Sequence, residues 1–359
     1  MVLITNVYGP NLVLRLENSK KHPIYLFGDW HMSLNSQREC PVTQDSIRVD
    51  HLFRKLFKAN KNKIGLYVEI TRDMITHYAD DKNHYVQPYI HLMRTLLSNN
   101  VKFHPKTKTI HTSEEFPNVM FHYTDLRSES VFGTFVNTSF DQRAVLDAVQ
   151  QIHNLKSMAA FAMNDLNKNK DFVKVLNQKY NDSSIQDAIT GFYQRLIKAC
   201  NKYLDKDYEK GIKQVQKYID FYHKHKTELD EVRTDELVNK ISNVFYNLRA
   251  DGTTYCVLLN DLYTLRRLLD KRYKTSVDYI YCGGMHALNM ALFLIKYTDY
   301  KLTHSTGNHA SLIKNVKNYS PDWFTKNSLQ IVSSVLGYNY YVEPVTQCVD
   351  LSAFPKQLI

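Results

Sequence analysis

The chain has 359 residues, of which 43% are hydrophobic and 23% charged, and this composition excludes a disordered chain. The formal net charge is +10, but the lysines are spread along the sequence without an arginine-rich or aromatic-interleaved block, so a nucleic-acid partner is not favoured. The N-terminal residues do not form a signal peptide, and no stretch approaches the roughly 18 apolar residues of a membrane span. We therefore expect a cytoplasmic protein without a membrane anchor.

The five cysteines are scattered along the chain, and none of them belongs to a Cys-x-x-Cys pair. This spacing argues against a zinc ribbon and against a thioredoxin-like site. We expect reduced thiols, as in a cytosolic compartment.

The first third of the chain alternates predicted strands with predicted helices. Short apolar runs that stop at glycine or at a charged residue are typical of buried strands, and apolar residues at three- and four-residue spacing indicate helices. Strands are expected at Leu12–Leu16, Pro23–Phe27, Ile64–Ile70, Val101–Phe103 and Val119–Tyr123, and helices at Asp45–Lys58 and Val86–Leu97.

From about Asp141 to Arg249 the pattern becomes helical throughout, with Lys, Gln, Asp and Asn on the polar faces. We interpret this stretch as a helical insertion at 141–250, between an N-terminal part of an α/β core at 1–140 and a C-terminal part with a tail at 251–359. Helices are expected at Gln142–Leu155, Asp171–Gln178, Ile185–Tyr203, Tyr208–Lys224 and Glu236–Leu248.

The strand and helix pattern then resumes. A helix is expected at Tyr255–Arg272, a strand at Val277–Tyr281, a helix at His286–Tyr297 and a strand at Tyr300–Thr303. The sequence therefore predicts an α/β fold with a mostly parallel central sheet flanked by helices and with a large all-helical insertion.

Two matching Gly-x-x-His turns follow predicted strands: Gly28-Asp29-Trp30-His31 and Gly283-Gly284-Met285-His286. Glu69 ends another strand, and Arg127 lies just beyond the strand at Val119–Tyr123, after Asp125. Because the carboxyl ends of parallel strands meet at one edge of a sheet, we expect these side chains to converge on one site.

The converging residue types suit a divalent metal ion or general acid–base chemistry. Gly28 and Gly283 would allow a ligand or cofactor to approach the backbone closely, and the helix that begins near His286 favours an anionic ligand. Taken singly, each residue has a plainer explanation: His31 as a loop residue, Glu69 as the partner of Arg72, or His286 as a helix cap. The recurrence of the motif after two strands favours one shared site.

A metallophosphoesterase is a weaker interpretation of the same residues. Asp29-Trp30-His31 is similar to the Asp-x-His that opens those enzymes, and Gly307-Asn308-His309 is similar to their Gly-Asn-His. The Gly-Asp-x-x-Asp segment that should lie between the two is missing, and their separation is too large.

The order of the motifs resembles the TraB/Tiki superfamily, which includes erythromycin-esterase-like and haem-binding ChaN-like proteins. The Gly-x-x-His at 28–31, Glu69 within Tyr67-Val68-Glu69-Ile70 and the Gly-x-x-His at 283–286 match its pattern, with Arg127 as the candidate arginine and Arg72 as its rival. The segment Asp261-Leu262-Tyr263-Thr264-Leu265-Arg266 is similar to a motif of a branch found in large DNA viruses of eukaryotes, which would place the protein in the host cytoplasm or the virion.

The resemblance implies a metal-dependent hydrolase of peptide or ester bonds in a small-molecule or peptide substrate. His31, Glu69 and His286 would hold a divalent metal ion, with Glu69 alternatively as the base, Asp29 orienting its neighbour and Arg127 holding an anionic group. Several relatives have Glu where this chain has Asp29.

Two alternatives come from the same resemblance. One is a haem-binding protein with a histidine or Tyr263 as axial ligand, and the other is a basic virion or structural protein with a degenerate site. The sequence does not decide between a monomer and a homo-oligomer.

Overall fold

The computed structural model describes residues 6–29, 46–71, 75, 89–104, 109–112, 114–125, 187–191, 194, 206–269, 274–307 and 347–355. The chain divides into two compact units, one made of residues 1–126 with 263–359 and the other of residues 127–262. The second unit contains the whole stretch predicted as an insertion, and its described residues there are helical apart from the turn at 226–230.

A six-stranded sheet forms the centre of the first unit, and the expected α/β class with a mostly parallel sheet is confirmed. Four neighbouring strands of this sheet run parallel to one another, while β2 is antiparallel to both of its neighbours. Across the sheet the order is β10 (Lys301–Gly307), β2 (Leu12–Glu17), β3 (Pro23–Asp29), β9 (Val277–Gly283), β5 (Ile64–Thr71) and β8 (Val119–Asp125).

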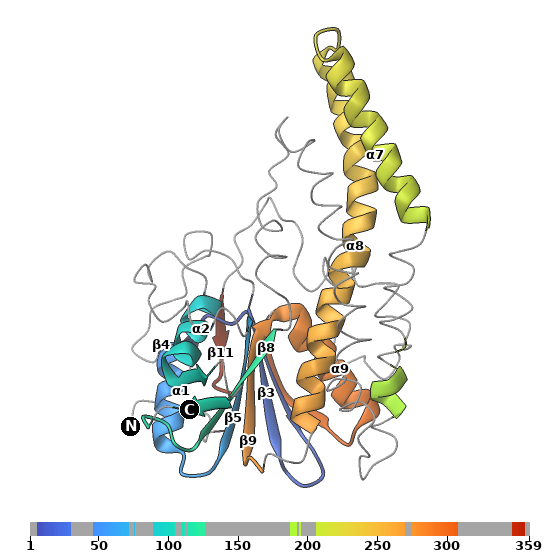
Figure 1. The fold of residues 1–359 in the computed structure, drawn as a ribbon. Helices are drawn as coiled ribbons and strands as arrows, with labels where there is room; N and C mark the ends of the chain where they lie inside the picture. The colour runs from blue at the N-terminus through green and yellow to red at the C-terminus, as the bar shows by residue number, and fades with distance from the viewer. Residues whose placement is uncertain are drawn as a thin grey trace. The chain divides into compact units, whose positions relative to one another are not determined.

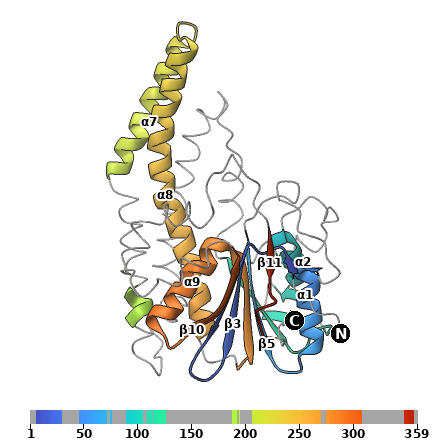
Figure 2. The same ribbon diagram turned by 180° about the vertical axis from the view of Figure 1, so that it is seen from behind.

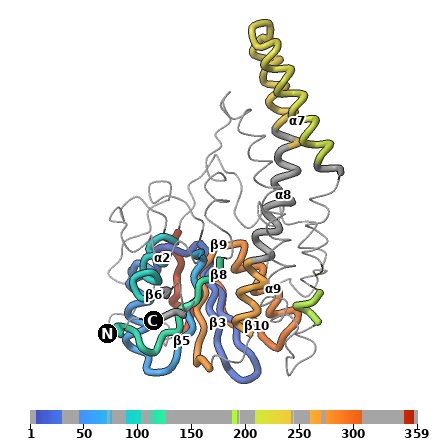
Figure 3. The backbone as a smooth tube through the Cα atoms, viewed as in Figure 1, coloured from blue at the N-terminus to red at the C-terminus, as the bar shows by residue number. Residues whose placement is uncertain are grey.

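The strand order explains the sequence pattern of each strand. All residues of β5 and β9 are buried, because parallel strands covered on both faces need apolar side chains on both. Strand β10 lies at an edge of the sheet, and its residues are exposed or half-buried. In Figure 3, β9 lies beside β3 and β5 although it comes from the far end of the chain.

Helices cover both faces of this sheet (Figures 1 and 2). Helices α1 (Val49–Ala59) and α2 (Tyr89–Asn100) pack on one face, and α9 (Gly284–Tyr297) packs on the other. Between α1 and the sheet, the ring of Phe53 meets those of Phe27 and Tyr279 edge-on, at centroid distances of 5.2 and 5.5 Å. Edge-to-face pairs of this kind stabilise a core beyond the area they bury.

Two smaller sheets complete the described strands of the first unit. One has the order β11 (Cys348–Asp350), β1 (Asn6–Tyr8) and β4 (Ser46–Arg48), and the other pairs β6 (Val101–His104) with β7 (Thr109–Thr112). The helix expected from Asp45 was therefore wrong at its start. Residues 46–48 pair in parallel with β1 and bury Ile47, and the helix begins at Val49.

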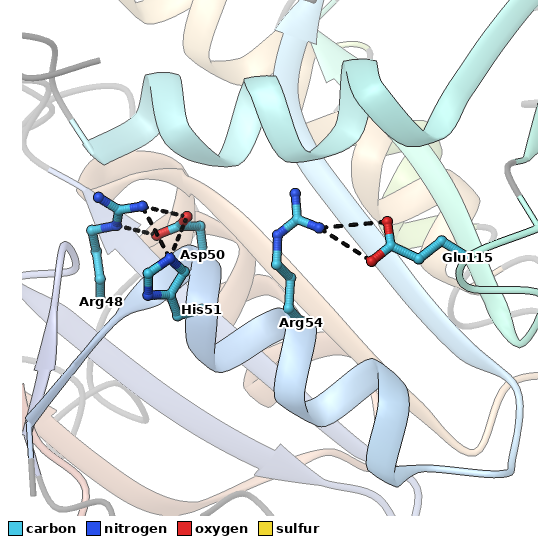
Figure 4. A network of polar contacts seen from close by, with 5 residues as sticks. All are labelled: Arg48, Asp50, His51, Arg54 and Glu115. Carbon is cyan, nitrogen blue, oxygen red and sulfur yellow. Dashed lines mark hydrogen bonds and ion pairs between the residues drawn. The ribbon is translucent and has the colours of Figure 1, made fainter.

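Ion pairs hold α1 at its beginning and along its side (Figure 4). Arg48 donates two hydrogen bonds to Asp50, of 2.6 and 2.9 Å, and thereby fixes the carboxylate in the first turn of the helix. Farther along α1, Arg54 reaches Glu115 in the segment before β8, with a separation of 3.4 Å between Nη1 and Oε1.

The helices of the second unit are longer than expected. Helix α7 spans Lys206–His225, and α8 runs from Glu231 to Leu269 as one helix where the sequence predicted two. The predicted break lies near Gly252, and a single glycine inside a helix costs about 1 kcal/mol, too little to end it. The helices expected at Gln142–Leu155 and Asp171–Gln178 lie outside the described residues.

Two further findings concern the helices and the cysteines of the described residues. Among the described helices, none is both long and apolar enough to cross a bilayer. The expectation of reduced thiols holds for Cys282, which is buried and forms no disulfide bond, but it is wrong for Cys348, which is disulfide-bonded.

Gly28 brings β3 and α9 close together. A Cβ atom at this position would lie 2.9 Å from Gly284 Cα and 3.3 Å from Leu12 Cβ. Neither neighbour is the flexible end of a long side chain, so the first turn of α9 can pack against the end of β3 only because residue 28 has no side chain.

We expect Gly28→Ala to lower the free energy of unfolding by about 1–3 kcal/mol, because the added methyl group overpacks a backbone contact. Urea denaturation of the full chain measures this loss. Gly211→Ala, inside α7, is the control and should be neutral or stabilising because alanine has the higher helix propensity. Equal stability of Gly28→Ala and the wild type would contradict the packing role.

Candidate functional site

Glu69 and His286 meet at the carboxyl edge of the parallel strands. Glu69 is near the end of β5 and His286 is in the first turn of α9, and both are buried, with 4% and 6% of their surfaces exposed. His286 Nε2 lies 3.6 Å from Glu69 Oε1. The structure thus brings together two of the side chains that the sequence assigned to one site.

The backbone of α9 orients the Glu69 carboxylate. Gly283, the residue that caps this helix, donates its N–H to Glu69 Oε2 at 2.6 Å. A carboxylate at a helix N-terminus is favoured by the free amide groups and by the helix dipole. On the other side of the residue, Arg94 of α2 donates to the Glu69 carbonyl oxygen at 2.6 Å. One carboxylate oxygen therefore binds the helix while the other is directed toward His286.

Asp29 lies on the opposite face of the sheet from Glu69. Side chains alternate along a strand, and Ile70 belongs to the apolar core packed by α1 and α2, so its neighbour Glu69 points to the α9 face. Asp29 instead accepts a hydrogen bond of 2.5 Å from the hydroxyl of Tyr281, which belongs to that same core. Burial, followed by the charge of Asp29, raises the pKa of Tyr281 well above its usual value, so this hydroxyl stays a donor.

A cluster of rings extends along β5 and β8 toward the end of α8. His122 stacks on Tyr67 with centroids 4.5 Å apart, and Tyr123 stacks on Tyr263 at 6.1 Å. The guanidinium of Arg267 lies over both tyrosine rings of the second pair. Tyr263, the residue expected as a haem ligand in the alternative function, therefore packs its ring against a cation and another ring.

The remaining residues expected in the site lie outside the residues that the structure describes. Residues 30–45, 72–74 and 126–150 are not described, so the places of His31, Arg72 and Arg127 stay predictions. Among the described side chains, no group of three or more His, Cys, Asp or Glu is arranged to hold a metal ion. The described part of the site supplies Glu69 and His286 on one face and Asp29 on the other.

The two glycines of the motifs have defined roles in the structure. Gly28 makes room for α9, as described above, and Gly283 supplies the N–H that binds Glu69. Sequence reasoning missed three neighbours of the site: Tyr281, Arg94 and Arg267. Tyr281 stands two residues before Gly283 and could have been found from the pairing of β3 with β9, while no pattern in the sequence pointed to the other two.

Tyr281→Phe should lower the free energy of unfolding by about 1–3 kcal/mol, because it leaves the buried Asp29 carboxylate without this hydrogen bond. Tyr279→Phe removes a hydroxyl from the same strand and core, so it serves as the control in urea titrations. Equal losses in the two variants would show that the Tyr281–Asp29 hydrogen bond contributes nothing of its own.

The pH dependence of stability should report on His122. Burial, followed by the charge of Arg267, lowers the pKa of His122 from 6.5 to about 3. A histidine whose pKa is lower in the folded state stabilises that state above its unfolded pKa, and this contribution is lost as the pH falls from 6.5 toward about 3.

In His122→Phe, which keeps a ring against Tyr67, unfolding free energy should therefore fall less steeply with acidification than in the wild type. Chemical denaturation at a series of pH values measures the slope. A slope unchanged in His122→Phe would rule out a neutral, buried His122.

Comparison with known proteins identifies relatives of this chain and the family to which it belongs. Three proteins of Acanthamoeba polyphaga mimivirus, uncharacterized proteins R706, R161 and R160, are 23%, 24% and 23% identical to this chain. The alignments cover 98%, 98% and 99% of this chain and 96%, 98% and 98% of the relatives. No solved structure matches the chain. The model of one family matches residues 5–183 and 142–359, and the chain therefore belongs to DUF5847, a family of unknown function.

Proposed function

We propose that this protein is a metal-dependent hydrolase of peptide or ester bonds, with its reaction centre at Glu69 and His286. The observation that carries the proposal is the buried pair itself, 3.6 Å apart at the carboxyl edge of the parallel strands. Open α/β sheets bind their ligands at this edge. The resemblance of the Gly-x-x-His motifs to the TraB/Tiki superfamily supports the same reaction class, and the viral relatives favour the host cytoplasm or the virion as its location.

The separation of the pair fits two ligands of one metal ion. Nitrogen and oxygen ligands about 2.1 Å from a tetrahedral metal ion lie about 3.4 Å apart. The Glu69 oxygen that faces His286 is not the one bound to Gly283, so it can serve as a ligand while the helix holds the carboxylate in place. His31, from the matching motif, is the proposed third ligand. A bound divalent ion would polarise the scissile carbonyl group and activate a water molecule.

The residues of this chain have separate tasks in the proposed site. Glu69 accepts a proton from the attacking water at its oxygen that faces His286, or holds the metal ion, and α9 keeps it oriented. Asp29, held by Tyr281, lies on the other face of the sheet and orients the chain that leads to His31. Arg127 holds an anionic group or the developing oxyanion.

Metal content of the purified full-length protein tests the proposal together with hydrolysis. We expect bound divalent metal by mass spectrometry, cleavage of p-nitrophenyl esters or fluorogenic peptides, and loss of cleavage with a chelator. Glu69→Gln and His286→Ala should each lower cleavage about 100-fold or more and reduce bound metal.

A second histidine–carboxylate pair supplies the matched control. His22 Nε2 lies 2.8 Å from Asp278 Oδ2 near the starts of β3 and β9, at the other end of these strands. His22→Gln should keep wild-type metal content and activity. Negligible metal in the wild type, or equal metal in all variants, would refute the ligand assignment. An absorbance band near 400 nm on addition of haem would favour the haem-binding alternative.

A further inference from the structure

Arg267 has an unusual environment near the end of α8. Its Cζ atom lies 4.8 Å from the centroid of the Tyr263 ring and 5.3 Å from that of Tyr123, and the residue is half-buried. A guanidinium group over aromatic rings at these distances is attracted to them and loses freedom of movement. Because β8 ends the central sheet on this side, the two rings hold the cation at a sheet edge.

The hydrogen-bond partner of Arg267 carries no negative charge. Its Nη1 lies 3.4 Å from Nδ1 of His122, which is stacked on Tyr67. The lowered pKa of His122 keeps this imidazole neutral at physiological pH. The contact thus uses one of five N–H donors and leaves the charge of the guanidinium uncompensated.

Four other arginines in the described part of the chain are neutralised. Arg15, Arg48, Arg54 and Arg233 each lie within 4 Å of a carboxylate oxygen, on Glu17, Asp50, Glu115 and Asp230 respectively. For Arg267, no described carboxylate lies within that distance, although half-burial has removed part of its hydration. A cation in this state is stabilised by an anion that reaches it from outside the fold.

We propose that Arg267 is the anchor of an anion subsite that binds a carboxylate or phosphate group. The planar guanidinium offers two parallel N–H groups to two oxygen atoms, which is the recognition mode of both anions. An alternative role for Arg267 is to neutralise the C-terminal dipole of α8. That role needs only a positive charge, so a mobile lysine would be sufficient. The two rings and the histidine instead fix the plane of the guanidinium, and that fixed plane is what two-oxygen recognition requires.

His122 connects the subsite to the face of the sheet that carries the proposed reaction centre, whereas Tyr123 packs against the core on the other face. Tyr67, which stacks on His122, and Glu69 are two residues apart on one face of β5, a rise of about 7 Å. A substrate that reaches both groups would extend from Glu69 past Tyr67 to His122 and Arg267. If the proposed hydrolase function holds, its substrate carries an anionic group beside the bond that is cleaved, and this part of the inference rests on that function.

The binding test uses simple anions and needs no catalytic activity. Sodium phosphate and sodium succinate are titrated into the full-length protein at constant ionic strength, balanced with sodium chloride, and binding is followed by calorimetry and by the shift in Tm. We expect one or both anions to bind the wild type, and the preferred anion distinguishes a phosphate from a carboxylate ligand.

Three variants identify the residue responsible. Arg267→Lys keeps the charge but loses the two parallel N–H groups of the guanidinium, and it should weaken anion binding about tenfold or more. Arg233→Gln, which removes an arginine paired with Asp230 at the other end of α8, should bind as the wild type does. Arg54→Gln, which removes an arginine paired with Glu115 on α1, should also bind normally. Circular dichroism confirms folding in each case. Absence of binding to the wild type, or equal binding by Arg267→Lys, would overturn the subsite.

A kinetic comparison separates this inference from the proposed function. With mono-p-nitrophenyl succinate, Arg267→Lys should raise KM and leave kcat near the wild-type value, whereas both constants should be unchanged with neutral p-nitrophenyl acetate. Anion binding that depends on Arg267 without any hydrolysis would refute the hydrolase and retain the subsite. Hydrolysis with the same KM for the succinate ester in both proteins would refute the subsite and retain the hydrolase.

Discussion

The N–H of Gly283 and the carboxylate of Glu69 form the hydrogen bond on which the arrangement of the site depends. This bond joins the start of α9 to the end of β5, so it fixes where the first turn of the helix lies relative to the sheet. The absence of a side chain at Gly28 allows the same turn to approach β3. His286 is three residues into this fixed turn, and its position next to Glu69 follows from these two contacts.

Glu69 therefore has a structural task and a proposed chemical one. As a helix cap it compensates free amide groups, and a buried carboxylate would be unfavourable at this place without them. The same hydrogen bond leaves one oxygen directed at His286, with the carboxylate already oriented. Reactive groups need this kind of preorganisation, since a site that must order its side chains during the reaction loses rate. One bond thus serves both the fold and the proposed reaction centre.

Much of the sheet could be predicted from the sequence because its central strands are buried on both faces. The runs at Pro23–Phe27, Ile64–Ile70 and Val277–Tyr281 are continuous and apolar, and each corresponds to a strand. Short strands such as β1 and β11 gave no such signal, since three residues do not establish a period. For the same reason β4 was mistaken for the first turn of α1.

The sequence predicted which residues of the candidate site lie at the ends of neighbouring strands, but not the direction in which their side chains point. The convergence of Glu69 with His286 followed from parallel pairing alone, whereas the side of the sheet to which each residue points required the strand register. That register separates Asp29 from Glu69 and gives Asp29 its partner Tyr281. Arg267 acquires its environment from rings on two distant segments, which no local pattern reveals. The positions of His31 and Arg127 remain predictions.

The insertion of β9 between β3 and β5 has a consequence for the order in which the protein folds. Asp29 and Tyr281 are 252 residues apart in the chain, and residues 127–262 form a unit of their own between them. During synthesis, β3 and β5 leave the ribosome long before the strand that separates them, and contacts of such high sequence separation form slowly. Until β9 arrives, the facing edges of these two strands are unpaired, and nascent chains at this stage are the ones most in need of chaperone protection.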